Sequence, residues 1–79
     1  MARYRTGVSA TVGGVDVLTD CYYDAASVRV AAMKAVYNSP LADCFAYLDS
    51  PDYSMGSYVG FSVFDNDGIL IGRIIVMEV

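Results

Sequence analysis

The sequence predicts an α+β fold in which one helix packs on one face of an antiparallel sheet of four to five strands. Three observations predict it: regular alternation of residue types over residues 3–12, an alanine-rich segment over residues 25–38, and two apolar segments, 58–64 and 69–76, that flank a short turn. The predicted order is strand, strand, helix, strand, strand, strand (β-β-α-β-β-β). With 79 residues, the chain is expected to form a single domain, residues 1–79.

The first two strands are predicted to form a hairpin. Within residues 3–12, one face carries the more apolar set: Tyr4, Thr6, Val8, Ala10 and Val12. Gly13-Gly14 follows, which is a favoured two-residue hairpin loop. Residues 15–22 then return as the second strand.

The alanine-rich segment is predicted to be the helix. Asp24 is its expected N-cap, because a carboxylate there accepts from the free amides of the first turn. Pro40 ends the helix, because the residue before a proline avoids helical backbone angles. At 100° per residue, one side of the helix should pack on the sheet: Val28, Ala31, Ala32, Ala35 and Val36.

The segment after the helix allows two interpretations. Ser39 could cap a short helix that has Pro40 at its first position. Alternatively, residues 43–49 form a strand, which is the interpretation we favour. Residues 49–57, DSPDYSMGS, are expected to form a loop.

The last two strands surround the sequence DNDG, residues 65–68. A calcium loop with Gly68 at its sixth position would place Val63 and Ile74 at ligand positions, which neither can fill. Asp67-Gly68 instead predicts a type I′ hairpin turn. That turn sets three cross-strand pairs on one face: Val63 with Gly72, Phe61 with Ile74, and Val59 with Val76.

The composition argues against an enzyme, a metal site and a cofactor site. There is no histidine and no phosphate-binding loop, and the carboxylate pair Asp49 and Asp52 sits in a domain too small for a substrate cleft. The net charge is −4 and the five bases are scattered, so direct nucleic-acid binding is not expected. We expect a soluble, cytoplasmic protein with no membrane association. Cys21 and Cys44 should then be reduced and buried, with a disulfide between them as the alternative.

Apolar residues exceed what one core can bury, since 56% of the chain is hydrophobic. Val30, Met33 and Tyr37 form a second stripe on the helix, nearly opposite its core face, and we expect a homodimer to form through it. The last hairpin also has an apolar second face: Tyr58, Phe64, Ile69, Ile71, Ile75 and Met77. The alternative is that the first hairpin folds across this face and buries it. Uncovered, it would mark an interaction site.

Eight of the nine acidic residues are aspartates. They could form a solvated rim that keeps an apolar protein in solution. The more specific hypothesis is that some of them form a surface that binds a basic, nucleic-acid-binding region of a protein partner. Its predicted members are Asp49, Asp52, Tyr53, Tyr58, Asp65 and Asp67.

In size, acidity, layout and lack of catalytic residues, the chain resembles the small phage-encoded anti-CRISPR proteins that inhibit the type I surveillance complex, Cascade. The resemblance covers the whole chain and includes no diagnostic motif. It implies an inhibitor, often dimeric, that blocks target-DNA binding in the host cell cytoplasm. The alternatives are a phage structural or assembly protein that acts by self-association, and a regulatory partner domain.

Overall fold

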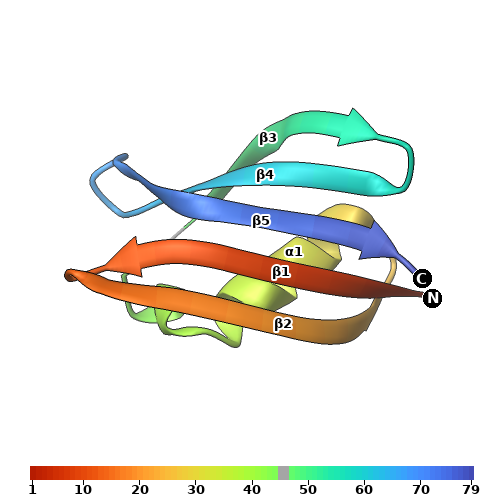
Figure 1. Cartoon of the computed structure of the whole chain (residues 1–79), viewed down its shortest axis with the longest axis horizontal. Coiled ribbons are helices and arrows are strands. Elements are labelled where there is room, and N and C mark those ends of the chain that lie inside the picture. The colour runs from red at the N-terminus through yellow and green to blue at the C-terminus, as the bar shows by residue number, and fades with distance from the viewer. Residues whose placement is uncertain (45–46) are drawn as a thin grey trace.

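The computed structural model of the protein describes residues 1–44 and 47–79, with the backbone alone for residues 43–44, 47, 49–50 and 52–55. It shows a five-stranded antiparallel sheet of order β2-β1-β5-β4-β3, with one helix packed against β2, β1 and β5 (Figure 1). The predicted α+β fold is confirmed. The elements are β1 (Ala2–Val12), β2 (Val15–Ala25), α1 (Val28–Tyr37), the 3-10 helix η1 (Pro40–Cys44), β3 (Tyr47–Met55), β4 (Tyr58–Phe64) and β5 (Leu70–Glu78).

The first hairpin forms as predicted and is part of the main sheet. Gly13 and Gly14 both have positive φ, 57° and 78°, as a two-residue type I′ loop requires. The β2 strand runs to Ala25, three residues beyond its predicted end, because it stays in register with β1 as far as Ala2. Since β1 also pairs with β5, the first hairpin cannot fold across the second face of the sheet. That alternative is wrong.

The helix packs through the side that the sequence predicted, but it begins later. Ala31, Ala32, Ala35 and Val36 are buried, and Val28 is partly buried against the same core. The N-cap is Ser27, whose Oγ accepts from the Val30 amide at 3.2 Å. The prediction of Asp24 was wrong because that residue still belongs to β2.

Residues 40–44 form the short helix, which is the less favoured of the two interpretations. Ser39 Oγ accepts from the Leu41 amide at 3.3 Å, and Leu41 is fully buried. The favoured strand is therefore wrong over residues 43–44, while residues 45–46 lie outside the described part of the chain. The predicted loop of residues 49–57 is wrong over residues 49–55, because β3 continues to Met55, and residues 56–57 form a turn. The pairing of β3 with β4 is irregular around Pro51, a residue tolerated in sheets chiefly on edge strands.

The last hairpin has the predicted register but a different turn. The Gly68 amide donates to the Asp65 carbonyl at 3.0 Å, so residues 66–68 form a three-residue loop in place of the type I′ turn. Asp65 Oδ1 holds this loop by accepting from the amides of Asp67 and Ile69 at 2.9 and 3.0 Å. The ladder shifts by one residue near Ile71, and this bulge restores the register. All three predicted cross-strand pairs are confirmed.

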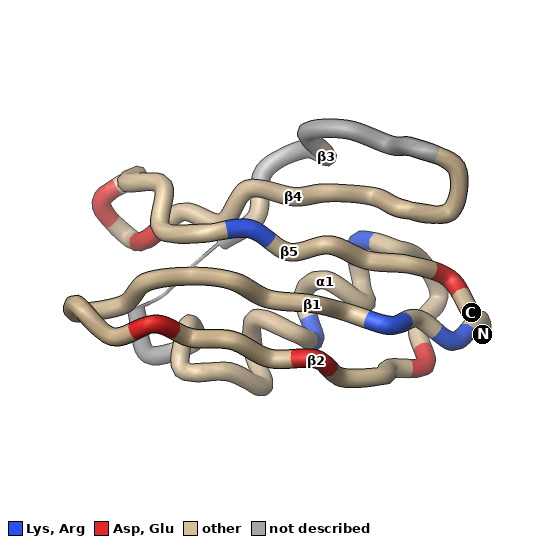
Figure 2. Tube along the Cα trace, in the orientation of Figure 1, with Lys and Arg blue, Asp and Glu red and all other residues tan. Residues whose placement is uncertain are grey.

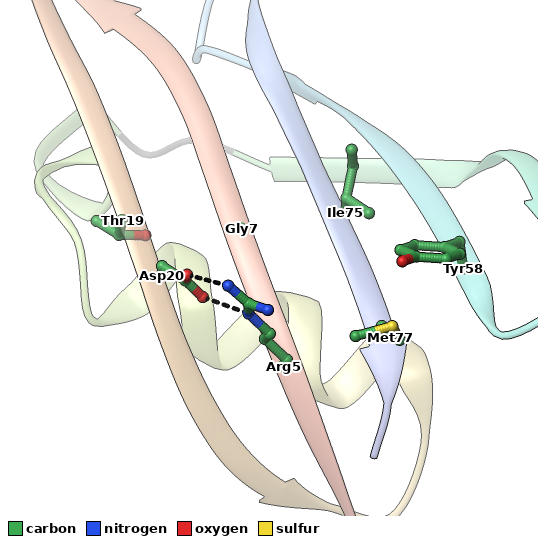
Figure 3. Close-up of a pocket in the computed structure, with 7 residues that line it drawn as sticks. All are labelled: Arg5, Gly7, Thr19, Asp20, Tyr58, Ile75 and Met77. Atoms are coloured by element: carbon green, nitrogen blue, oxygen red, sulfur yellow. Dashed lines mark hydrogen bonds and ion pairs between the residues drawn. The ribbon is translucent and has the colours of Figure 1, made fainter.

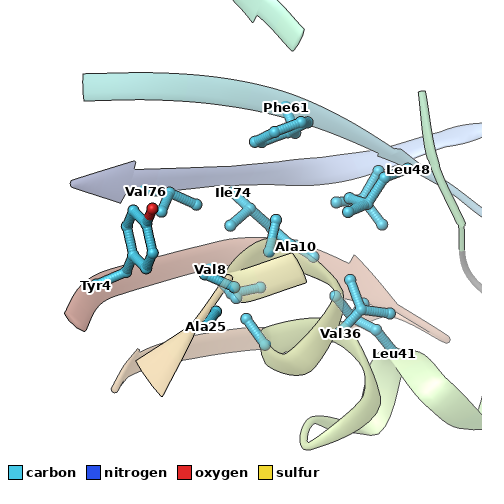
Figure 4. Close-up of a cluster of buried hydrophobic side chains, with 14 residues drawn as sticks. Tyr4, Val8, Ala10, Ala25, Val36, Leu41, Leu48, Phe61, Ile74 and Val76 are labelled. Atoms are coloured by element: carbon cyan, nitrogen blue, oxygen red, sulfur yellow. The ribbon is translucent and has the colours of Figure 1, made fainter. Parts of the chain in front are cut away.

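The core lies between the sheet and the two helices (Figure 4). Its largest fully buried side chains come from β4, β5, η1 and β1: Phe61, Val63, Ile74, Val76, Leu41 and Thr6. The hydroxyl of Thr6 donates to the Cys21 carbonyl at 3.1 Å, so this buried polar group is satisfied. The alanines of α1 let the helix approach the sheet closely.

Two strand glycines differ sharply in their surroundings, which gives a matched pair for a test. A Cβ at Gly72 would clash with Ala10 and with the Ser9 carbonyl on the neighbouring strand, whereas a Cβ at Gly7 would meet no atom within 4 Å. We expect Gly72→Ala to lower the free energy of unfolding by about 1–3 kcal/mol, as overpacking does. Gly7→Ala should leave it unchanged or raise it by about 0.5–1 kcal/mol.

Urea denaturation of both variants in dilute solution measures this difference. Equal stability of the two variants would contradict the close approach of β1 and β5.

Candidate interaction surface

No described helix covers the sheet face opposite α1, and we call this face the outer face. In Figure 1 the helix lies behind the sheet, so the outer face is the near one. Strand alternation places its members on four strands. They are Asp16, Leu18, Asp20, Tyr22 and Asp24 of β2, Arg3, Arg5, Gly7, Ser9 and Thr11 of β1, Arg73, Ile75 and Met77 of β5, and Tyr58, Gly60, Ser62 and Phe64 of β4.

Bases of β1 neutralise acids of β2 on this face. Arg5 Nε and Nη2 donate to the two carboxylate oxygens of Asp20 at 2.9 and 2.6 Å, which is a bidentate pair. Arg3 Nη1 donates to Asp24 at 3.3 Å, and its guanidinium lies 5.4 Å from the centre of the Tyr22 ring. The hydrogen bond from Arg5 lowers the pKa of Asp20, and the bond to Asp20 raises the pKa of Arg5. Charge is therefore balanced at this end of the sheet.

A shallow hollow of about 290 Å³ lies at the centre of the outer face. It forms where Gly7 contributes no side chain to β1. Figure 3 shows Tyr58, Ile75 and Met77 on one side of Gly7 and the Arg5–Asp20 pair on the other. The hollow thus has an apolar wall and a wall of two charges that already satisfy each other.

The turns of the first hairpin (β1–β2) and the last hairpin (β4–β5) lie at one end of the sheet (Figure 2). We call residues 13–16 and 65–70 the hairpin tips. Their apolar side chains are exposed: Val15 by 65%, Ile69 by 59% and Leu70 by 53%. The tips also hold Asp16, Asp65 and Asp67, and neither tip contains a lysine or arginine. Acidic charge is therefore uncompensated within the tips, in contrast to the opposite end of the sheet.

The residues predicted to bind a partner do not all lie together. Asp65 and Asp67 are in a hairpin tip, whereas Tyr58 begins β4 at the opposite end, about 20 Å away at the rise of a strand. Asp49, Asp52 and Tyr53 belong to β3, and their side chains lie outside what the structure describes. The prediction missed Asp16, Val15 and Leu70. Leu70 is in the same hairpin tip as Asp67, but only the pairing of β1 with β5 brings Val15 and Asp16 to that end, and no local pattern signals this pairing.

The structure also locates the residues predicted for self-association and the cysteines. Val30 and Tyr37 are exposed by 37% and 65%, but Met33 is partly buried against the core. Ile71, expected on the second face, also packs against the core. Cys21 is free but exposed, so its predicted burial is wrong. It lies on the edge strand β2, where the helix gives it little cover.

The Arg5–Asp20 pair makes stability depend on pH in one direction. The folded-state pKa of Asp20 is below its value in the unfolded chain, so the pair stabilises the fold above the ordinary Asp pKa. This contribution is lost as the pH falls through the lowered pKa. Carbon-detected NMR titration should show an Asp20 pKa below the ordinary aspartate value of 3.8, and Arg5→Gln should raise this pKa toward that value. An unchanged Asp20 titration in Arg5→Gln would show that the pair does not form in solution.

Comparisons with known proteins give no relative from which a function could be transferred. No described group of three or more His, Cys, Asp or Glu side chains could hold a metal ion, and no helix among the described residues is long and apolar enough to cross a membrane. No protein-family model, curated protein sequence or solved structure matches the chain.

Proposed function

We propose that the protein is a small inhibitor that binds a basic, nucleic-acid-binding surface of another protein through its hairpin tips. One observation carries the proposal: the fold brings exposed apolar residues and uncompensated acids to the same end of the molecule. Val15, Ile69 and Leu70 supply apolar contact area there, and Asp16 and Asp67 supply negative charge. Apolar anchors favour affinity, while charge complementarity favours fast and selective association.

The 65–70 tip is ordered by its own hydrogen bonds. Asp65 Oδ1 accepts from two amides of the turn, which fixes the backbone on which Ile69 is carried. A preformed turn loses less conformational entropy on binding than a mobile loop. This supports a role for the tip as a rigid contact surface.

Four of the five bases are engaged within the chain, which argues for a protein partner and against nucleic acid. Arg3 and Arg5 are paired with aspartates, Lys34 Nζ donates to the Asp24 carbonyl at 2.5 Å, and Arg29 donates to the Leu48 carbonyl at 3.2 Å. Binding to a phosphate backbone depends on cations that are free to displace counterions. Acids at the tips suit the opposite task, which is to occupy a groove that normally receives phosphates.

A type I CRISPR surveillance complex is the partner class that we propose, because its DNA-binding groove is basic and a small acidic binder can block it by occupying space. Incubation of the purified protein with purified Cascade should abolish target-DNA binding, measured by fluorescence anisotropy. Full DNA binding in the presence of excess protein would rule out this target. Recovery of the protein alone from nuclease-treated host lysate would favour the structural, self-associating alternative.

Two single charge reversals provide a matched test of the contact surface. Asp67→Lys reverses one charge in the exposed tip, and Glu78→Lys makes the same change at the opposite end of the sheet. We expect Asp67→Lys to weaken partner binding about tenfold or more, which corresponds to about 1.4 kcal/mol. Glu78→Lys should have little effect. Equal affinities of the two variants, measured by calorimetry, would exclude the tips as the contact surface.

A further inference from the structure

We propose that two copies of the chain pack outer face to outer face, with Ile75 of each copy in the Gly7 hollow of the other. The inference rests on the outer face alone and does not depend on the proposed inhibitor function. It assigns self-association to the sheet and not to the helix stripe of Val30, Met33 and Tyr37. Met33 is partly buried against the core, so the stripe has less exposed apolar surface for an interface.

The size of the outer face matches what a dimer requires. The longer extents of the molecule are 33 and 21 Å, so this face offers close to the ~800 Å² per partner of a standard-size interface. A domain of this length buries a smaller share of its surface on folding than a large domain does, so it gains from a second apolar contact. The apolar exposure fits, since Ile75 is exposed by 44%, Tyr58 by 48% and Leu18 by 75%.

The two central strands of the sheet have complementary shapes. On the outer face, β5 carries the ridge Arg73, Ile75 and Met77, while the centre of β1 carries the small residues Gly7 and Ser9. Ile75 and Gly7 are direct cross-strand neighbours. A Cβ atom built at Gly7 would meet nothing within 4 Å, so the space directly above Gly7 is open. A knob and a hole therefore stand side by side at the middle of the face.

A two-fold axis parallel to the strands, between β1 and β5, uses this complementarity twice. It lays the β5 ridge of each copy over the β1 trough of the other, so Ile75 faces Gly7 in both directions. Two sheets packed in this way would be about 10 Å apart, as in a β-sandwich. The interface is isologous and closes at two copies.

The charges of the outer face are compatible with this arrangement. Arg5 and Asp20 would enter the interface as a pair that is already satisfied, which limits the cost of removing their water. Arg73 is exposed, and it has no carboxylate partner among the described residues. The axis lays the acidic strand β2 of the second copy over β4, next to Arg73, where Asp16 and Asp20 are the nearest acids.

The arrangement also keeps the turn residues Asp67 and Ile69 free, whereas Asp16 lies on the outer face at the border of the interface. Because the axis runs along the strands, the two tips of one copy and the two tips of the other would project at the same end of the dimer. The dimer would then present two copies of the acidic and apolar surface to one partner, which raises its effective affinity.

Light scattering coupled to gel filtration tests the proposal with three variants. At high micromolar concentration we expect the wild-type chain to have twice its 8.5 kDa mass. Ile75→Asp should weaken the dimer at least about 100-fold, because a carboxylate would be buried against apolar surface. Gly7→Val should also give a monomer, because the new side chain fills the hollow. Tyr37→Asp, on the exposed helix stripe, is the control and should remain dimeric.

Gly7→Val separates a loss of dimerisation from a loss of folding. A β-branched residue in a strand is favourable, and Gly7 has ordinary backbone angles and open space, so the thermal midpoint of the monomer should not fall. A monomeric wild type, or a dimer that survives both Ile75→Asp and Gly7→Val, would overturn the proposal.

An isotope-filtered NOE experiment on mixed labelled and unlabelled chains identifies the contact. It should show the Ile75 methyl groups close to Gly7 of the other copy. Intermolecular contacts of Val30 and Tyr37 in their place would assign the interface to the helix stripe and refute the outer-face dimer. A monomer that still blocks its partner would refute the dimer and leave the inhibitor proposal standing.

Discussion

The pairing of β1 with β5 is the contact on which the rest of the structure depends. It joins the two ends of the chain and merges two hairpins into one sheet. The pairing needs a glycine at 72, because Ala10 and the Ser9 carbonyl occupy the space that a side chain would take. Once this pairing forms, Val8 and Ile74 lie side by side under the helix, and a single core can close.

The same pairing decides where the charges lie. It aligns the first and last hairpins so that their turns share one end of the sheet (Figure 2), and the hairpin tips there carry Asp16, Asp65 and Asp67. At the other end, cross-strand neighbours neutralise one another, as Arg5 and Asp20 do. A chain with a modest net charge thereby acquires one acidic end and one balanced end. The asymmetry matters more for recognition than the net charge does, because salt screens the field of an exposed charge beyond about 10 Å.

A fold with one helix can cover only one face of its sheet. In this protein the uncovered face holds a ridge at Ile75, a gap at Gly7 and ion pairs that need no outside partner. The tips hold aspartates and contain no lysine or arginine. The proposed division of tasks follows from this difference. The outer face, where charges of β1 and β2 pair with each other, is suited to a second copy, and the tips are suited to a basic partner.

The sequence by itself determined what depends on neighbouring residues. Period-two and helical patterns gave the inward faces of β1, β4, β5 and α1, and the register of the last hairpin was correct because it depends on alternation and a short loop. The tertiary structure decided the rest. Which strands are neighbours and how far β2 and β3 extend depend on long-range pairing that no local pattern encodes. The extension of β2 to Ala25 then decides between the two local cap candidates, Asp24 and Ser27. Pro51 signalled a loop, yet it is tolerated in β3 because that strand lies at an edge of the sheet. The hairpin tips were predicted only in part, since Asp67 marks a turn in the sequence whereas its position near Val15 and Asp16 exists only after β1 and β5 have paired.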